Sequence, residues 1–195
     1  MIKDRNLDLQ AYKFYYILKP DVATNSIVAA EDVSSDVTAC TLAKTTLDYP
    51  RNLLYTLTDN SSDTLEAIFT TVGYDQFGEL VTEVVEVDYN VSATTDGSQI
   101  FSEIVSIAID GTNNTTSDTA DVGVSITTDV ASFGLPDKIG AVTDIKAVTF
   151  VDNGVVAMQN IDSTSVVVAR HCFRPEQTVA VADDYVIRYK SSAYN

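Results

Sequence analysis

The chain has no tryptophan, one histidine and two cysteines among its 195 residues. These scarcities exclude several kinds of site. His171, Cys40 and Cys172 cannot form a four-ligand zinc site without help from carboxylates. The phosphate-binding pattern G-x-x-x-x-G-K-[ST] and the calcium-loop pattern D-x-[DN]-x-[DN]-G do not occur. We therefore expect no catalytic residues, no metal site and no cofactor.

A cysteine nucleophile needs a base placed beside it in space. His171 and Cys172 are neighbours in the chain, and neighbouring residues on a strand point to opposite faces, so a strand would keep them apart. A spatial pair of Cys40 with His171 stays open from the sequence alone.

Carboxylates are abundant, but none is arranged in a diagnostic pattern. Glu79, Glu83 and Glu86 could supply the two carboxylates that glycoside cleavage needs, although such sites usually also carry tryptophan. The segment Asp110–Asp118 offers oxygen ligands for calcium and is expected to be a solvated loop. A hydrolase is the weakest of the functions considered.

The chain also lacks a long apolar run. No segment approaches the roughly 18 residues of a membrane helix, and "MIKDRNLDLQ" is charged from its third residue, which argues against a secretory signal. We expect two reduced cysteines in a chain made and assembled in a cytoplasm.

Basic residues are few. Twelve Lys and Arg against 28 Asp and Glu give a formal net charge of −16. Such a chain repels phosphate backbones and anionic membranes, so neither nucleic acid nor membrane is an expected partner. The charge either keeps a sheet-rich protein soluble or docks it on a basic partner surface.

No segment repeats its apolar residues with the 3.6 period of a helix, whereas alternation with period two is common. Two examples are 11–19, "AYKFYYILK", and Leu80–Val87, where Val81, Glu83, Val85 and Val87 oppose the other set. Gly78 is expected to close the turn before Leu80 with a positive φ. The sequence predicts an all-β antiparallel sandwich or barrel of about a dozen short strands, with an extended N-terminal arm and little helix.

The only plausible seam lies at Thr45–Tyr49. It would divide residues 1–44, an arm and the first strands, from a main β domain at 45–195. One continuous domain is the alternative.

Two segments combine aromatic with basic residues, which is the composition that protein interfaces favour. The predicted interface residues are Lys3, Arg5, Tyr12, Lys13, Phe14, Tyr15, Tyr16 and Lys19 near the N-terminus, and Arg170, Phe173 and Arg174 in "ARHCFRP". The alternative for the N-terminal set is a core strand with charged edges.

Several stretches, in order, resemble tailed-bacteriophage structural proteins: "YPRNLLYTLTDNSSD", "FTTVGYDQFGELVTEVVEV", "IFSEIVSIAIDG", "DTADVGVSI" and "FGLPD". The resemblance covers roughly residues 45–140 and extends more weakly to Tyr189. The chain departs from the pattern at Glu66–Phe69, where a Gly-led strand is usual, and its N-terminal aromatic segment has no counterpart.

The resemblance implies a non-enzymatic virion protein. The leading expectation is a capsid decoration (cement) protein on the capsid surface, bound to the major capsid protein or other virion proteins, and homo-oligomeric, with a trimer as the guess. Alternatives are a neck or tail component, or a carbohydrate- or receptor-binding β-sandwich.

Overall fold

The computed structural model describes residues 12–33, 38–60, 66–88, 93–112, 118–152 and 154–190. Within them the chain forms sixteen strands and two single-turn 3-10 helices, η1 (Val142–Asp144) and η2 (Val168–Arg170). The strand pairings among these residues are antiparallel and build three sheets. The predicted all-β class is therefore confirmed.

The strands divide among sheets A, B and C as follows. Sheet A has the order β1 (Lys13–Leu18), β16 (Asp184–Tyr189), β12 (Ile145–Asp152) and β13 (Val155–Gln159). Sheet B has the order β2 (Val28–Asp32), β10 (Thr119–Val124), β5 (Leu53–Thr58) and β8 (Thr94–Asp96). Sheet C has the order β14 (Val166–Val167), β15 (Cys172–Phe173), β11 (Phe133–Gly134), β4 (Thr46–Arg51), β9 (Phe101–Thr112), β6 (Glu66–Tyr74) and β7 (Leu80–Asp88), with β3 (Thr38–Ala39) also paired to β9.

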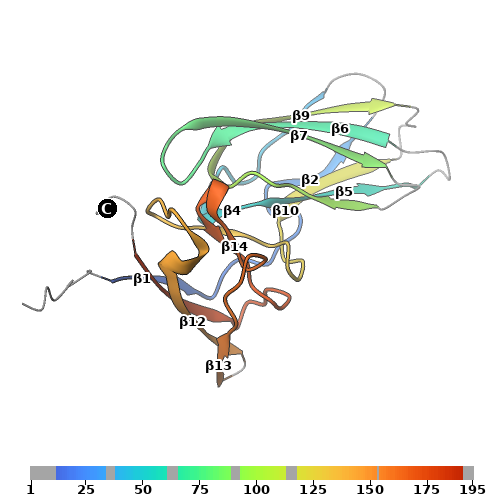
Figure 1. Cartoon of the computed structure of the whole chain (residues 1–195). Helices are drawn as coiled ribbons and strands as arrows, with labels where there is room; N and C mark the ends of the chain where they lie inside the picture. The colour runs from blue at the N-terminus through green and yellow to red at the C-terminus, as the bar shows by residue number, and fades with distance from the viewer. Residues whose placement is uncertain are drawn as a thin grey trace, which may run out of the picture.

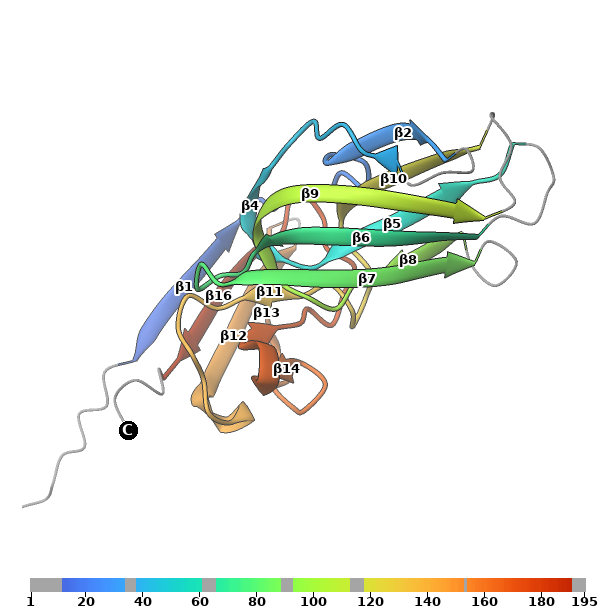
Figure 2. The same cartoon turned by 90° about the horizontal axis from the view of Figure 1, so that it is seen from above.

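Sheet B packs on the long strands β9, β6 and β7 of sheet C to form a sandwich (Figures 1 and 2). Its core is one apolar cluster drawn from both sheets, including Leu53, Tyr55 and Val122 from sheet B and Phe69 and Ile107 from sheet C. The period-two alternation of these strands is what delivers one apolar face from each sheet.

The short strands β11, β15 and β14 carry sheet C out of the sandwich into a second lobe. There a separate apolar cluster forms against the inner side of sheet A, with Phe133, Phe173, Tyr185 and Ile187 among its members. The second lobe lies beside and below the sandwich in Figure 1.

The first and last described strands both lie in the second lobe, because β1 pairs with β16 along its whole length. Between them the chain crosses into the sandwich before β2 and returns after β10. The sandwich cluster includes Ile27 and Val28 as well as Leu47 and Leu53, so one core spans both sides of the predicted seam. The expected seam itself contains strand β4.

Two local predictions, the turn at Gly78 and the alternation in β7, are confirmed. Gly78 has φ 77° and closes the β6–β7 turn as expected. The alternation in β7 is also observed, since Glu83, Val85 and Val87 are buried and Leu80, Val84 and Glu86 are exposed.

Arg51, the last residue of β4, lies at the point where the two lobes meet. Its side chain is fully buried, and its guanidinium donates from Nη1 to the carbonyl of Asp21 and from Nη2 to the carbonyl of Ser125, both at 2.7 Å. Those carbonyls belong to the two segments by which the chain enters and leaves the sandwich. The guanidinium also lies 4.6 Å from the centre of the Phe133 ring, a core residue of the second lobe.

Burial lowers the pKa of Arg51 to about 10, and the nearby carboxylates of Asp48 and Asp21 oppose that shift. The group therefore keeps its charge at neutral pH. Asn52 completes the junction: its Nδ2 donates to the carbonyl of Gly97 at 2.9 Å, and its Oδ1 accepts from the N–H of Ser132 at 2.7 Å. The Arg51–Asn52 pair thus ties sandwich to second lobe.

Replacing this cation tests the junction. Arg51→Met removes the donors to the part-buried carbonyl of Asp21 and the buried carbonyl of Ser125, and should lower the free energy of unfolding by about 3 kcal/mol or more. Lys44→Met is the matched control, because Lys44 also contacts Asp21 (Nζ to Oδ2, 2.9 Å) but is partly exposed, and its loss should cost about 1 kcal/mol or less. Urea unfolding followed by circular dichroism measures both. If Arg51→Met and Lys44→Met lowered the free energy of unfolding equally, the role given to Arg51 would be contradicted.

Candidate protein-contact surfaces

The outer side of sheet A is exposed and largely apolar. Paired residues on neighbouring antiparallel strands point to the same side of a sheet, and the register gives three rows across the four strands. We call this surface the aromatic face. Its members are Phe14, Tyr16 and Leu18 on β1, Asp184, Val186 and Arg188 on β16, Ala147, Thr149 and Val151 on β12, and Val156 and Met158 on β13.

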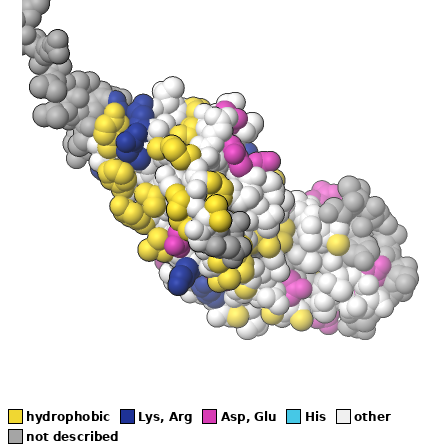
Figure 3. All heavy atoms as spheres, turned by 90° about the horizontal axis from the view of Figure 1, so that it is seen from below, with side chains coloured by type: hydrophobic (Ala, Val, Ile, Leu, Met, Phe, Trp, Pro, Cys, Tyr) yellow, Lys and Arg dark blue, Asp and Glu magenta, His cyan; other side chains and the backbone are white. Residues whose placement is uncertain are grey.

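Large apolar side chains dominate this face. Phe14 is 55% exposed, Tyr16 53% and Met158 72%, all high values for side chains of this size. Figure 3 shows hydrophobic side chains gathered over this part of the molecule with Lys and Arg at its border, while the sandwich end shows acidic side chains and few hydrophobic ones. Contiguous apolar surface of this kind marks contact sites in soluble proteins.

The inner side of sheet A holds the face rigid. Tyr185, Ile187 and Tyr189 alternate with the outward residues of β16 and are buried. The Tyr189 hydroxyl donates to Oδ2 of Asp137 at 2.6 Å, and Lys13 pairs with Oδ1 of the same carboxylate at 2.6 Å. This bridge ties β1 and β16 to the loop after β11.

Strand β1 is an edge strand, with β16 as its neighbour on one side. At one end of its free edge, the Tyr49 hydroxyl accepts from the N–H of Leu18 at 2.8 Å and donates to the Leu18 carbonyl at 3.0 Å. Tyr49 thereby caps the position where a further strand would otherwise continue pairing.

Cations gather at the opposite end of the face. The Arg188 guanidinium lies 5.2 Å from the centre of the Tyr12 ring, and Lys190 Nζ lies 5.7 Å from it. Such contacts hold basic groups over aromatic rings at the border of the face.

The N-terminal interface residues are placed differently from one another. Tyr12, Phe14 and Tyr16 are exposed. Lys13 and Tyr15 point inward, and Lys19 is exposed just beyond β1. Lys3 and Arg5 lie outside the described residues. Strand β1 thus has one side that packs on the core and one side that is exposed.

The second predicted patch does not form one surface. Phe173 is fully buried in the second lobe's core, which corrects its assignment as an interface residue. Arg174 is half-buried, and its Nε donates to Oγ of Ser132 at 3.2 Å. A local mixture of Arg and Phe cannot reveal that β15 is an interior strand.

The sequence prediction missed Leu18 on β1 and the contributions of the later strands, above all Val186, Arg188, Val156 and Met158. The alternation of Tyr185, Ile187 and Tyr189 would have left Val186 and Arg188 facing outward. It could not have shown that β16 lies beside β1, since the two are separated by most of the chain.

A second exposed sheet face lies on the sandwich, over β7, β6 and β9, reached from the side seen in Figure 2. It mixes apolar and acidic side chains, and we call it the acidic face. Its members are Ile68, Tyr74, Leu80, Val84, Glu86, Glu103, Val105 and Asp110.

The two lobes differ in charge. Residues 27–124 contain 17 acidic and two basic residues, a formal net charge of −15, so the remainder of the chain carries −1. The negative charge of the protein therefore belongs almost wholly to the sandwich.

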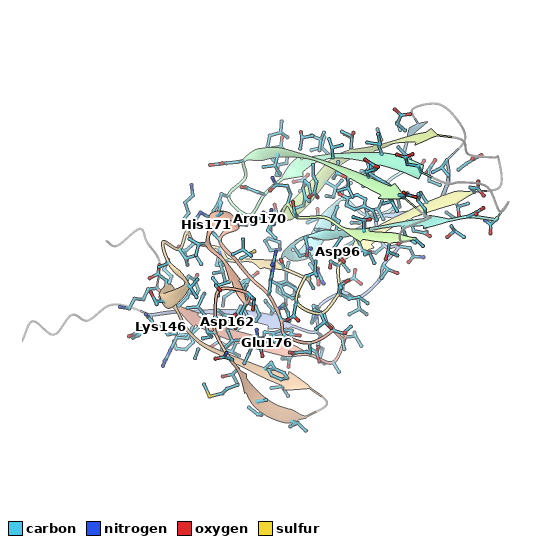
Figure 4. The ribbon with its side chains drawn as sticks, turned by 45° about the vertical axis from the view of Figure 1, so that its right-hand side comes forward. Asp96, Lys146, Asp162, Arg170, His171 and Glu176 are labelled. Carbon is cyan, nitrogen blue, oxygen red and sulfur yellow. The ribbon has the colours of Figure 1, made fainter. Side chains whose placement is uncertain are left out.

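The lone histidine lines a hollow of about 160 Å³ between the β6–β7 turn and η2 (Figure 4). His171 Nδ1 accepts from the N–H of Ile139 at 3.2 Å, and its ring meets Phe77 edge-on with centres 5.5 Å apart.

The two cysteines are not part of this hollow, and Cys40 packs against the sandwich cluster. Burial raises the pKa of the Cys40 thiol to about 12, with Glu31 adding to the shift, and burial also raises that of Cys172. Both are free thiols that stay protonated at neutral pH.

The candidate carboxylates do not form a catalytic pair. Glu83 is buried, and its Oε1 accepts from the N–H groups of Ser98 at 2.5 Å and Gln99 at 2.9 Å, whereas Glu86 points outward on the same strand. Glu83 therefore anchors a loop. The loop expected at Asp110–Asp118 falls mostly outside the described residues.

In the part of the chain that the structure describes, no group of three or more His, Cys, Asp or Glu is placed to hold a metal ion. The same residues include no helix long and apolar enough to cross a membrane. In comparisons with known proteins, no family model matches the chain, and neither a curated protein nor a solved structure matches it.

Alkaline pH tests the buried support of the aromatic face. Burial raises the pKa values of Tyr15, Tyr185 and Tyr189, and for Tyr189 the hydrogen bond to Asp137 and its charge add to the effect. Their folded pKa values lie above the unfolded value near 10, so stability is fully present below about pH 10 and falls above it, by up to about 1.4 kcal/mol per pH unit for each tyrosine.

Urea unfolding at several pH values above about 10 measures how steeply the free energy of unfolding falls with pH. Tyr189→Phe should reduce this slope by the contribution of one tyrosine. An unchanged slope in that variant, or complete tyrosine ionisation at pH 11 with native circular dichroism, would contradict the assignment.

Proposed function

We propose that this chain is a structural virion protein of a tailed phage, a capsid decoration (cement) protein that binds the shell from outside as an oligomer. The observation that carries the proposal is the pair of flat, exposed sheet faces on different lobes, each with large apolar side chains. The ordered resemblance of "YPRN…", "GYDQFGE…" and "FGLPD" to phage structural proteins supplies the biological setting.

The geometry suits a bridging role. The acidic face is reached from above (Figure 2) and the aromatic face from below (Figure 3), so one molecule can contact two other bodies at once. A protein that binds across the junctions of an assembled shell favours the assembled state by mass action.

The two faces suit different partners. A sandwich with a net charge of −15 repels another copy of itself and is attracted to a basic surface. We therefore assign the acidic face to the shell, where Leu80 and Val84 supply apolar contacts and Glu86 and Asp110 supply charge. The partner it fits is a major capsid protein with a basic outer patch.

Co-sedimentation tests this function. Purified protein is mixed with capsids assembled without it and pelleted, and we expect saturable binding that weakens as salt screens the charges. Val84→Glu puts a charge at the centre of the contact and should weaken binding about 10-fold or more. Glu176→Lys, an exposed change in the second lobe (Figure 4), is the control and should leave binding in place. Absence of binding at every protein concentration would sink the proposal.

A second candidate rests on the exposed row of Tyr12, Phe14 and Tyr16, because sugar rings stack on such aromatic side chains. A carbohydrate-binding β-sandwich would use it as a platform. Glycan-array binding that disappears in Tyr16→Ala would favour this function over decoration, and a blank array would remove it.

A further inference from the structure

Among the described residues, no strand or loop lies over the aromatic face, and its large apolar side chains are exposed. We propose that its occupant is a second copy of this chain, packed face to face about a two-fold axis at Val186. The inference goes beyond the decoration role and is independent of it, since it concerns the purified protein alone.

The order of charges along β16 carries the argument. Its outward residues are Asp184, Val186 and Arg188, an acid and a base at equal distances from a central valine. Consider a two-fold axis that lies between the two packed sheets, perpendicular to their strands, and passes at Val186. This axis reverses the direction of β16 in the second copy. Asp184 of each copy then faces Arg188 of the other, which forms two identical ion pairs.

The alternative two-fold arrangement is unfavourable. An axis parallel to the strands would keep their direction and place Arg188 opposite Arg188 and Asp184 opposite Asp184. Like charges held together in a contact cost binding energy, so the charge order selects the first arrangement.

The same axis also places apolar residues of the neighbouring strands opposite apolar residues of the second copy. On β1, Phe14 of one copy faces Leu18 of the other, and Tyr16 faces its own counterpart. Met158 on β13 lies in the row of Val186 and likewise faces its counterpart. A self-complementary patch of this kind is what a two-fold dimer requires.

Size and charge are also compatible. Four strands about 4.8 Å apart and rows spanning about 14 Å give, with side chains, on the order of 400 Å² in projection. A stable interface buries about 800 Å² on each partner, so rim residues such as Tyr12, Lys19 and Lys190 must contribute and a reversible dimer is expected. The contact joins lobes outside the strongly acidic sandwich, where repulsion between copies is least.

Sedimentation equilibrium of the purified chain over a range of concentrations tests the proposal. Wild type should reach twice the mass of the 21.1 kDa chain. Asp184→Lys and Arg188→Glu each place like charges together at both ends of the contact, and each should weaken the dimer about 10-fold or more. The double variant exchanges the charges on both copies and should return the dissociation constant to within about 3-fold of wild type, because the two pairs are restored.

Controls separate folding from association. Asp184 also accepts a hydrogen bond from the Lys19 N–H at 3.0 Å, so thermal unfolding is recorded for every variant, and Asp184→Asn supplies a charge-only change of similar shape. Glu86→Lys on the acidic face should leave the dimer unchanged. A monomeric wild type, a trimer, or a double variant no better than the single variants would overturn the two-fold contact. None of these results depends on shell binding. The decoration role is therefore tested separately, by co-sedimentation with capsids.

Discussion

The burial of Arg51 is the interaction on which the two-lobed structure depends. A buried guanidinium is costly to the extent that its donors lack partners. In Arg51, Nη1 and Nη2 donate to the carbonyls of Asp21 and Ser125, where the chain crosses between lobes, while the buried Nε has no hydrogen-bond partner among the described residues. Asn52 adds bonds from the same strand to Gly97 and Ser132. The Pro-Arg-Asn segment, which begins the resemblance to phage proteins, is therefore a structural junction.

Fixing that junction fixes the positions of the two exposed faces. Sheet C runs from the sandwich through β4 and β11 into the second lobe, so its strands link the acidic face to the core beneath the aromatic face. A rigid connection matters for a bridging protein, because contacts at both ends strengthen one another only when their separation is defined.

The difference in charge between the lobes gives each face a distinct chemistry. The sandwich holds nearly all of the net negative charge, while the second lobe is almost neutral and places basic groups around exposed rings. In the proposed attachment, repulsion would separate the acidic faces of different copies and favour a basic partner. The aromatic face, with acid and base ordered along β16, is the one suited to a like copy. One chain can thus serve attachment and self-association through separate sheets.

The sequence by itself determined the all-β class, most strand positions and the Gly78 turn, because period-two alternation and turn chemistry are local properties. It left open which side of the alternating segment 11–19 is exposed. It did not determine that β1 lies beside β16, that β4 occupies the expected seam, or that Phe173 is interior. These depend on which strands pair, and pairing between segments distant in the chain is set by the packing of the whole core. The aromatic face exists only through such pairing, since its rows combine residues from both ends of the chain.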